Sequence, residues 1–298
     1  MTGLRGRYRR AVPDRVRRVA SLRPLRNRTR ARVNAWRYNR ALPGDAPVLN
    51  FYPRLPPPNA KILRAMRRLG LRIGHQPRGD QPTIAWEGAA LLRPEHAARL
   101  PSNAINRHCL DLRKSTVDRA WAEVAGYTIS VDPLAWDDVL VVKSEENGLH
   151  DGQLVIGPLA RRRSGVVYQR LVDSREGDRI KNYRAFLVGT EIVLVFEVWR
   201  VYPHWFSSVG MAMPRRPSEL LSEPEIEQVL RFAAALGMDY GEIDIVRDRH
   251  SGLIYAVDAN RTPLQGALLN KADYTRTYRP LADALGRLLA DWRPLEAG

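Results

Sequence analysis

The 298-residue sequence predicts an α+β (α/β) fold, because strand hairpins and amphipathic helices follow one another along the chain. Runs of β-branched and aromatic residues on either side of short turns predict one hairpin over residues 240–257 and a longer one over 183–201. Residues 218–236 have helical periodicity, a serine–glutamate capping box and a glycine just beyond their end. A last helix is expected over residues 279–292.

The first third of the chain adds shorter elements of both kinds. A strand over residues 46–52, a helix over 60–69 and strands over 71–74 and 83–86 predict a small α/β unit, which we assign to residues 43–104. This unit has no glycine motif for binding phosphate, so its role is packing or substrate docking.

Two lysines stand at the borders of predicted elements, where they are suited to grip phosphate. Lys114 precedes a helix over residues 115–124, and Lys143 ends the continuous apolar run 139–142, which is typical of a buried strand. Glycines in the loop after Lys143 let backbone N–H groups approach an anion. The alternative is that these are ordinary lysines at the ends of elements.

The 240–257 hairpin places acidic side chains on one face. A turn centred near Ser251 puts Asp244 opposite Asp258 and Glu242 opposite Asn260, with the four side chains pointing away from residues such as Val257. Like charges directly opposite each other repel, and a cation between them turns that repulsion into a binding site. Carboxylate and amide oxygens suit Mg²⁺ that carries substrate phosphates. The alternative is a solvated, acidic hairpin face.

The net charge of +16 is concentrated at the N-terminus. Residues 1–40 contain fourteen Arg and one Asp, a net charge of +13, which leaves about +3 for the rest of the chain. We therefore assign residues 1–42 to an arginine-rich tail, in which Val12, Val16 and Val19 have helical spacing. An anionic membrane surface, nucleic acid and an acidic partner remain open as its targets, beside a solvated extension without a partner.

Composition excludes several other classes of protein. The single cysteine, Cys109, rules out an internal disulfide and a cysteine-based zinc cluster. No apolar run approaches the ~18 residues that a membrane-spanning helix needs, and the arginine-rich N-terminus lacks the apolar segment of a secretory signal. These observations favour a cytoplasmic protein without a transmembrane segment.

Taken in order, the motifs over residues 105–295 resemble the ATP-grasp superfamily, and in particular its ribosomal-protein glutamate ligase, glutathione synthetase and D-alanine–D-alanine ligase types. The resemblance implies two α+β lobes that hold ATP between them. It divides the chain after residue 104 into a small lobe with a lid loop, residues 105–173, and a large lobe with the metal site, residues 174–298.

The resemblance also implies a role for each site residue. Lys114 and Lys143 correspond to the lysines that contact the nucleotide, and residues 146–152 to the phosphate lid. The nucleotide-binding hinge strand corresponds to Gln169, Arg170, Leu171 and Val172. Arg184 and Arg200 correspond to the catalytic arginines of the phosphate and acyl-phosphate site. The metal ligands correspond to Asp244, Asp258 and Asn260, which hold two Mg²⁺ ions in the family, with Mn²⁺ as a possible substitute.

The sequence departs from the family pattern at four places. Asp258 stands where the family usually has Glu, and Gln169 where it often has Glu. The lid has fewer glycines than most members, and the N-terminal unit is shorter than the usual substrate-binding lobe, so the acceptor site is undefined. The ordered set of motifs, rather than any single one, carries the resemblance.

Three functions follow as hypotheses. The first is an ATP- and Mg²⁺-dependent ligase that activates a carboxylate as an acyl phosphate for attack by an amine, with small-molecule or peptide substrates. The second is an ATP-grasp kinase or phosphotransferase that releases a phosphorylated product. The third is a non-catalytic binder of anionic surfaces or nucleic acid that acts through the arginine-rich tail.

Overall fold

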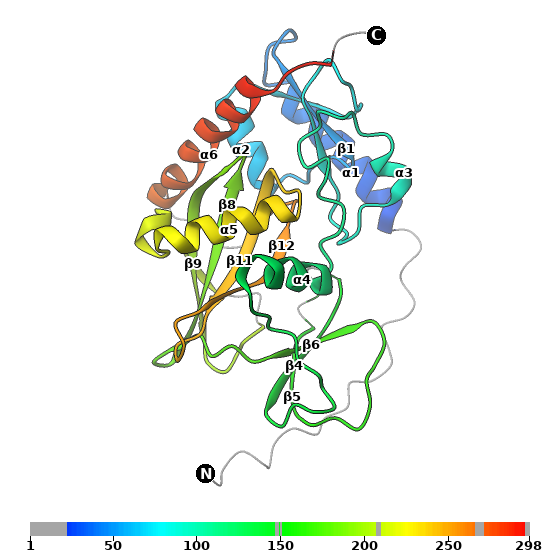
Figure 1. The fold of residues 1–298 in the computed structure, drawn as a ribbon. Coiled ribbons are helices and arrows are strands. Elements are labelled where there is room, and N and C mark those ends of the chain that lie inside the picture. Colours follow the sequence, from blue (N-terminus) through cyan, green and yellow to red (C-terminus); the bar gives the residue numbers. More distant parts are fainter. Residues whose placement is uncertain (1–22, 147–148, 150, 207–209, 266–270, 296–298) are drawn as a thin grey trace.

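The structure is a computed structural model that describes residues 23–146, 149, 151–206, 210–265 and 271–295. The described residues form helices and three β-sheets, so the predicted α+β class is confirmed (Figure 1). The largest sheet has the strand order β10-β9-β8-β11-β12, with β7 paired to one end of β8. Its strands are β7 (Arg175–Glu176), β8 (Arg179–Val188), β9 (Glu191–Val201), β10 (Met211–Arg215), β11 (Tyr240–Arg247) and β12 (Ile254–Asn260).

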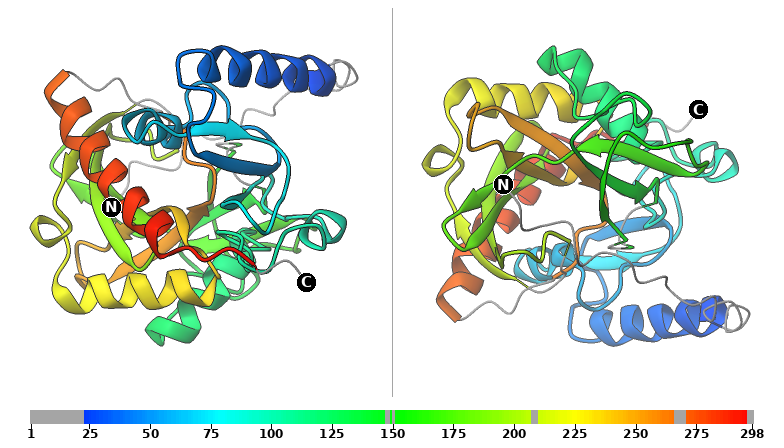
Figure 2. Two further views of the ribbon diagram at one scale, coloured as in Figure 1. Left: turned by 90° about the horizontal axis from the view of Figure 1, so that it is seen from above. Right: turned by 90° about the horizontal axis from the view of Figure 1, so that it is seen from below.

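Helices cover both faces of this central sheet (Figures 1 and 2). On one face, α4 (Lys114–Ala125) and α5 (Glu223–Ala235) bury Trp121 and Phe232 against alternate residues of β8 and β11. On the other face, α6 (Lys271–Asp291) and α2 (Lys61–Arg68) pack on the intervening residues. The period-two alternation of each strand therefore builds two separate cores from one sheet.

The face that carries α6 is apolar over only part of its length. On β8, Phe186 belongs to the core under α6, whereas Arg184, two residues earlier on the same face, lines a cavity. On β11, Tyr240 is in the same core, and Glu242 and Asp244 line the cavity. One sheet face is thus divided into a packed apolar half and a polar half.

Two smaller sheets flank the central one. The first has the order β5-β4-β6 and consists of β4 (Val139–Ser144), β5 (Gln153–Ile156) and β6 (Val166–Arg170). The second is parallel, with the order β2-β1-β3, and consists of β1 (Val48–Pro53), β2 (Arg72–Gly74) and β3 (Thr83–Trp86). It corresponds to the predicted N-terminal α/β unit. The remaining short elements are α3 (Pro94–Ala97) and the 3-10 turn η1 (Pro217–Glu219).

The predicted register of the 240–257 hairpin is confirmed, with one correction. Asp244 pairs with Asp258, and Glu242 pairs with Asn260. The register then shifts, so that Ile245 pairs with Ala256, and Val257 is left as the extra residue of a β-bulge. The expectation that Val257 points away from the acidic face was wrong, because the bulge interrupts strict alternation and Val257 lines the same cavity as Asp258.

Several element boundaries differ from the sequence predictions. Helix α6 begins at Lys271, eight residues before the expected start at 279, and continues through Pro280. The capping box of Ser222 and Glu225 is present, but α5 begins only after Ser222, and η1 takes the place of the first predicted turn. Strand β10 follows the 183–201 hairpin and has no counterpart among the elements predicted from the sequence.

The arginine-rich segment is structured from residue 23 onward. Helix α1 (Arg23–Asn39) lies along the outside of the molecule beside the N-terminal unit (Figure 2). Its last turn is anchored, because Tyr38 is buried in the core and the Asn39 side chain bonds the backbone of Ile73. A solvated extension is therefore wrong for Tyr38 and Asn39, whereas Val12, Val16 and Val19 lie outside the described residues.

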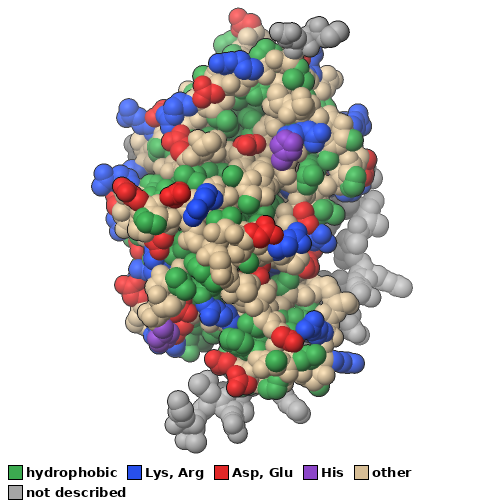
Figure 3. All heavy atoms as spheres, viewed as in Figure 1, with side chains coloured by type: hydrophobic (Ala, Val, Ile, Leu, Met, Phe, Trp, Pro, Cys, Tyr) green, Lys and Arg blue, Asp and Glu red, His purple; other side chains and the backbone are tan. Residues whose placement is uncertain are grey.

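Charges of both signs are intermixed on the face of the body shown in Figure 3. This distribution agrees with the near-zero charge expected for the chain beyond residue 40. Across the described residues, no helix is long and apolar enough to cross a membrane.

The only cysteine offers a direct test of the core between α4 and the central sheet. Cys109 is fully buried there, and burial raises the pKa of its thiol to about 11, although the Arg261 guanidinium beside it acts in the opposite direction. A neutral, inaccessible thiol is a poor nucleophile. We expect Ellman's reagent to leave the native protein unmodified and to titrate one thiol in denaturant. Rapid modification of the native protein would contradict this packing.

Candidate functional site

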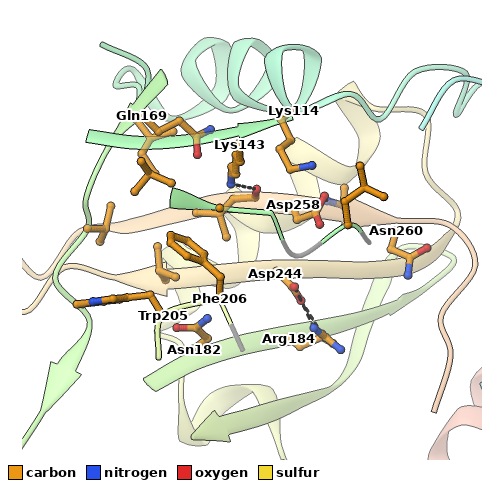
Figure 4. Close-up of a pocket in the computed structure, with 18 of the residues that line it drawn as sticks. Lys114, Lys143, Gln169, Asn182, Arg184, Trp205, Phe206, Asp244, Asp258 and Asn260 are labelled. Atoms are coloured by element: carbon orange, nitrogen blue, oxygen red, sulfur yellow. Dashed lines mark hydrogen bonds and ion pairs between the residues drawn. The ribbon is translucent and has the colours of Figure 1, made fainter. Parts of the chain in front are cut away.

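A cavity of about 500 Å³ lies between the small β5-β4-β6 sheet and the polar half of the central sheet. Every residue that the sequence singled out for the site lines this cavity (Figure 4). These residues are Lys114, Lys143, Gln169, Arg170, Leu171, Val172, Arg184, Arg200, Asp244, Asp258 and Asn260. They come from six strands, helix α4 and the segment after β6, so the fold brings together positions spread over 147 residues of sequence.

Two lysines of the cavity lining lie near Asp258. Lys143 lies on β4, and its Nζ donates to the backbone carbonyl oxygen of Val257 at 3.2 Å (Figure 4). Lys114 is the first residue of α4, and its Nζ donates to the backbone carbonyl oxygen of Glu146. Backbone carbonyl oxygens therefore hold both ammonium groups close to the acidic residues of the cavity. This leaves Asp258 beside two cations and without a direct ion pair to either among the described residues.

Arg184 holds the second aspartate. Its Nε and Nη2 donate to the two carboxylate oxygens of Asp244 at 2.6 and 3.0 Å, the forked geometry that a guanidinium and a carboxylate favour. The same Nε lies 3.9 Å from a carboxylate oxygen of Glu242. Arg184 therefore sits between two acids on one strand, and the cross-strand partner of Asp244 is Asp258.

Glu242 belongs to a buried ion pair that the sequence did not reveal. The Lys61 ammonium, at the start of α2, donates to the Glu242 carboxylate, and both side chains are more than 90% buried. The Lys61 Nζ also lies 4.2 Å from the ring centre of Phe196. Because Lys61 belongs to the N-terminal unit, no local pattern in the sequence joins it to a residue 181 positions later.

Crowding of charge shifts the ionisation of the site. Burial lowers the pKa of Lys143 to about 8, against the opposing effect of Asp258. Burial, followed by the neighbouring Asp244 carboxylate, raises the pKa of Asp258 to about 6, against the opposing effect of the two lysines. Burial acts to raise the pKa of Asp244 as well, but Arg184 outweighs it and the pKa is lowered. The side of the site around Asp258 therefore favours an added cation near its carboxylate.

Part of the cavity lining is apolar. It consists of Ile129, Val141, Val172, Val246 and Val257, which come from both sheets and the segments beside them. An apolar slot of this kind accepts a flat ring, whereas the lysines accept an anion.

The residues that flank this slot were predicted to form a hinge strand. Gln169 is almost completely buried and pairs through its backbone with Val141 on one side and Ser130 on the other. Arg170 lies over the ring of Tyr255, with its Cζ 4.6 Å from the ring centre. The strand is thus fixed by both neighbours, with its Gln169 side chain at the cavity wall (Figure 4).

The mouth of the cavity is closed in part by aromatic side chains. Trp205 and Phe206 line it opposite the predicted lid. A Cβ atom on Gly152 would lie 2.7 Å from the Phe206 ring, so this close approach of lid and aromatic loop requires glycine. Gly148, the other lid glycine, lies outside the described residues.

The donor set fits Mg²⁺ that completes its coordination with phosphate and water oxygens. Two carboxylates and an amide stand on adjoining strands, and all are hard oxygen donors. The Asn260 Oδ1 already accepts from the N–H and hydroxyl of Thr262 at 2.8 and 3.1 Å, which fixes the orientation of the amide. Within the described ranges, no three His, Cys, Asp or Glu side chains converge as a metal-binding group. A cation here therefore depends on oxygens from a ligand as well.

Known protein structures resemble this one in fold. No family model matches the sequence, and no curated protein matches it. The structure is similar to the ATP-grasp ligase PsnB complexed with a minimal precursor, at 14% sequence identity and a TM-score of 0.53 over 82% of this chain and 99% of that one. A PsnB complex with a phosphomimetic precursor variant, Mg and ADP gives 11% identity and a TM-score of 0.54 over the same shares.

A third similar structure is that of a different protein. The RimK-domain ATP-grasp protein of Sphaerobacter thermophilus is 15% identical, with a TM-score of 0.51 over 82% of this chain and 99% of that one. The chain therefore has the ATP-grasp fold, as the order of its motifs predicted.

The buried Lys61–Glu242 pair leads to a prediction about stability. Glu242→Gln leaves the Lys61 ammonium in an apolar setting without its counter-charge, and we expect the free energy of unfolding in urea to fall by about 3 kcal/mol. The double variant Lys61→Met/Glu242→Gln should recover much of that loss. Glu227→Gln, which removes one partner of an exposed pair on α5, is the control and should change little. Equal effects at the two glutamates would contradict the account.

Proposed function

We propose that this protein is an ATP- and Mg²⁺-dependent ligase that activates a carboxylate as an acyl phosphate and joins it to an amine. The observation that carries the proposal is a cavity whose lining combines an apolar slot with a cluster of two lysines, two arginines and two aspartates. An ATP molecule has the matching parts, a flat base and a polyanionic chain. The ATP-grasp fold of the chain agrees with this assignment.

Each group has a role in this proposal that follows from its position. The slot near Gln169 and Val172 takes the adenine ring, and Lys114 and Lys143 bind the phosphates as point charges. Asp244, Asp258 and Asn260 would hold Mg²⁺, which neutralises charge on the phosphates during transfer. Two ions are expected by resemblance, and Mn²⁺ is a possible replacement.

The proposed reaction has two steps, phosphoryl transfer to a carboxylate oxygen and then substitution at the acyl carbon. A carboxylate oxygen of the acid bonds to the γ-phosphorus of ATP as the bond to the ADP oxygen breaks. The amine nitrogen then bonds to the acyl carbon, inorganic phosphate leaves, and the amine loses a proton. Arg200, and Arg184 once it exchanges Asp244 for substrate, carry the positive charge that steadies the acid and the acyl phosphate.

The substrates are expected to be a small-molecule or peptide carboxylate and an amine. Structures of the neighbour PsnB contain a precursor peptide, which favours a peptide for at least one substrate of this protein. Trp205 and Phe206 at the mouth of the cavity supply apolar contacts for such a substrate.

The metal site gives the first test of this function. Asp258→Asn keeps the shape of the side chain but removes the charge that faces Asp244, so we expect Mg²⁺-dependent release of ADP to fall by about 100-fold or more. Asn260→Ala should also impair it. Asp283→Asn, on the exposed surface of α6, is the charge-matched control. Full activity of Asp258→Asn in a pooled amino acid and peptide screen would contradict the proposal.

Hydroxylamine separates the ligase from a kinase of the same fold. An acyl phosphate reacts with hydroxylamine to give a hydroxamate, whereas a phosphoester product does not. We expect hydroxamate to accumulate in step with ADP when the correct acid is present. ADP formed with a stable phosphorylated product and no hydroxamate would assign a kinase or phosphotransferase instead.

Truncation separates both enzymes from a non-catalytic binder. Because Tyr38 and Asn39 are anchored in the fold, the truncation that leaves the described structure intact removes residues 1–22. We expect ATP turnover to survive it, since the cavity is built from residue 114 onward with the loop at Gly88. Binding activity lost on truncation, without any nucleotide turnover in the full chain, would favour the binder.

A further inference from the structure

A second cavity lies beside α2. It has a volume of about 200 Å³ and is formed by α1, α2 and the proline-rich loop between β1 and α2. Three guanidinium groups line it, those of Arg37, Arg64 and Arg67. Among the described residues, none of the three forms an ion pair with a carboxylate. The cavity is therefore strongly basic and its charge is unbalanced.

Two of the three arginines, Arg64 and Arg67, lie over aromatic rings rather than beside acids. The Arg67 Cζ lies 4.9 Å from the ring centre of Tyr38, and the Arg64 Cζ lies 5.8 Å from that of Tyr274. A guanidinium stacked on a ring keeps its N–H edges available for an acceptor. Tyr38 is itself fixed, because it is buried and its hydroxyl donates to the Leu63 carbonyl oxygen at 3.4 Å.

One polar atom in this cavity has no partner. The Nδ2 of Asn34, on α1, is shielded from solvent and makes no hydrogen bond in the described structure. A buried donor without an acceptor is costly, and a ligand oxygen could bond this amide only after a shift of the Asn34 side chain. The guanidinium groups of the three arginines are all donors, and together they select a ligand that presents several acceptor oxygens.

From these contacts we propose that the cavity binds an acidic peptide segment, whose Asp or Glu carboxylates pair with Arg37, Arg64 and Arg67. Pro56, Pro58 and Leu63 give it an apolar wall that suits the aliphatic part of such a segment. The site is too small and concave for a lipid surface. Its one aromatic ring, that of Tyr38, is already covered by Arg67, which leaves no platform for stacking a nucleic-acid base.

Helix α2 connects this surface to the catalytic cavity. At its start, the Lys61 N–H donates to the Pro263 carbonyl oxygen at 3.1 Å, and Ala60 pairs with Leu264, which lines the catalytic cavity. An acidic segment bound across α2 therefore lies near the rim of the larger cavity. The binding proposal does not require the proposed ligase activity, and it is tested without it.

The test is binding of a fluorescein-labelled, glutamate-rich peptide to the full chain, followed by fluorescence anisotropy. We expect Arg37→Gln/Arg67→Gln to weaken binding by about tenfold, since two charge-assisted contacts are lost. The matched control is Arg32→Gln/Arg68→Gln, which removes the same charge from exposed positions on the same two helices outside the cavity. It should weaken binding by less than about twofold. Equal losses in the two variants would overturn the proposal, because the peptide would then be held by diffuse charge.

A second variant tests whether weaker peptide binding results from loss of folding. Asn34→Asp places a carboxylate among the three arginines, so it should weaken peptide binding while the melting temperature stays the same or rises. Unchanged binding by Asn34→Asp would overturn the site. Competition identifies the ligand class: the unlabelled peptide should displace the probe, and its glutamine analogue should not. Stronger, cavity-dependent displacement by inorganic phosphate, single-stranded RNA or anionic vesicles would overturn the assignment to a peptide.

Discussion

The repulsion between two aspartates on neighbouring strands is the constraint that organises the catalytic cavity. Asp244 and Asp258 are direct cross-strand partners, and such pairs have Cβ atoms only ~5 Å apart. The structure offsets this repulsion with cations from different elements: Arg184 binds Asp244, and Lys143 lies near Asp258. Burial, followed by the neighbouring Asp244 carboxylate, raises the pKa of Asp258 to about 6. In the proposed function, a divalent cation with phosphate oxygens would complete the balance of charge.

The central sheet allows one surface to serve both as core and as site. Toward one end, its face packs under α6, and toward the other end the same face carries the charged residues of the cavity. The boundary falls at Glu242, whose ion pair with Lys61 is buried between the two halves. The N-terminal unit therefore packs against the central sheet beside the cavity, although it contributes little to the described cavity lining. Substitutions at neighbouring positions on β11 are therefore expected to differ in effect. A change at Glu242 should lower stability, and a change at Asp244 should lower the proposed activity.

Much of this site was predictable because its chemistry is encoded locally. The hairpin register that pairs Asp244 with Asp258 follows from two apolar runs and a turn, and the position of Lys143 follows from the apolar strand before it. These are short-range patterns with a defined periodicity. The resemblance to the ATP-grasp superfamily then placed distant motifs around one nucleotide site, and the fold agrees with that order.

The features that sequence reasoning missed depend on contacts between distant segments. The bulge at Val257 is a one-residue change of register that local alternation does not specify. The pairing of Lys61 with Glu242 joins residues 181 positions apart, and the anchoring of α1 depends on where Tyr38 meets the N-terminal unit. Helix α6 extends through Pro280, because burial of Tyr278 and Leu281 against the sheet outweighs the local signal to break the helix.

The most direct measurement of the central claim is isothermal titration calorimetry of ATP binding with and without Mg²⁺. The opposed aspartates should repel the triphosphate in the absence of the cation, so binding is predicted to require Mg²⁺ and to be lost in Asp258→Asn with Mg²⁺ present. Equal affinity with and without Mg²⁺, or no binding at millimolar Mg-ATP, would contradict the assignment of Asp244, Asp258 and Asn260 as the metal site.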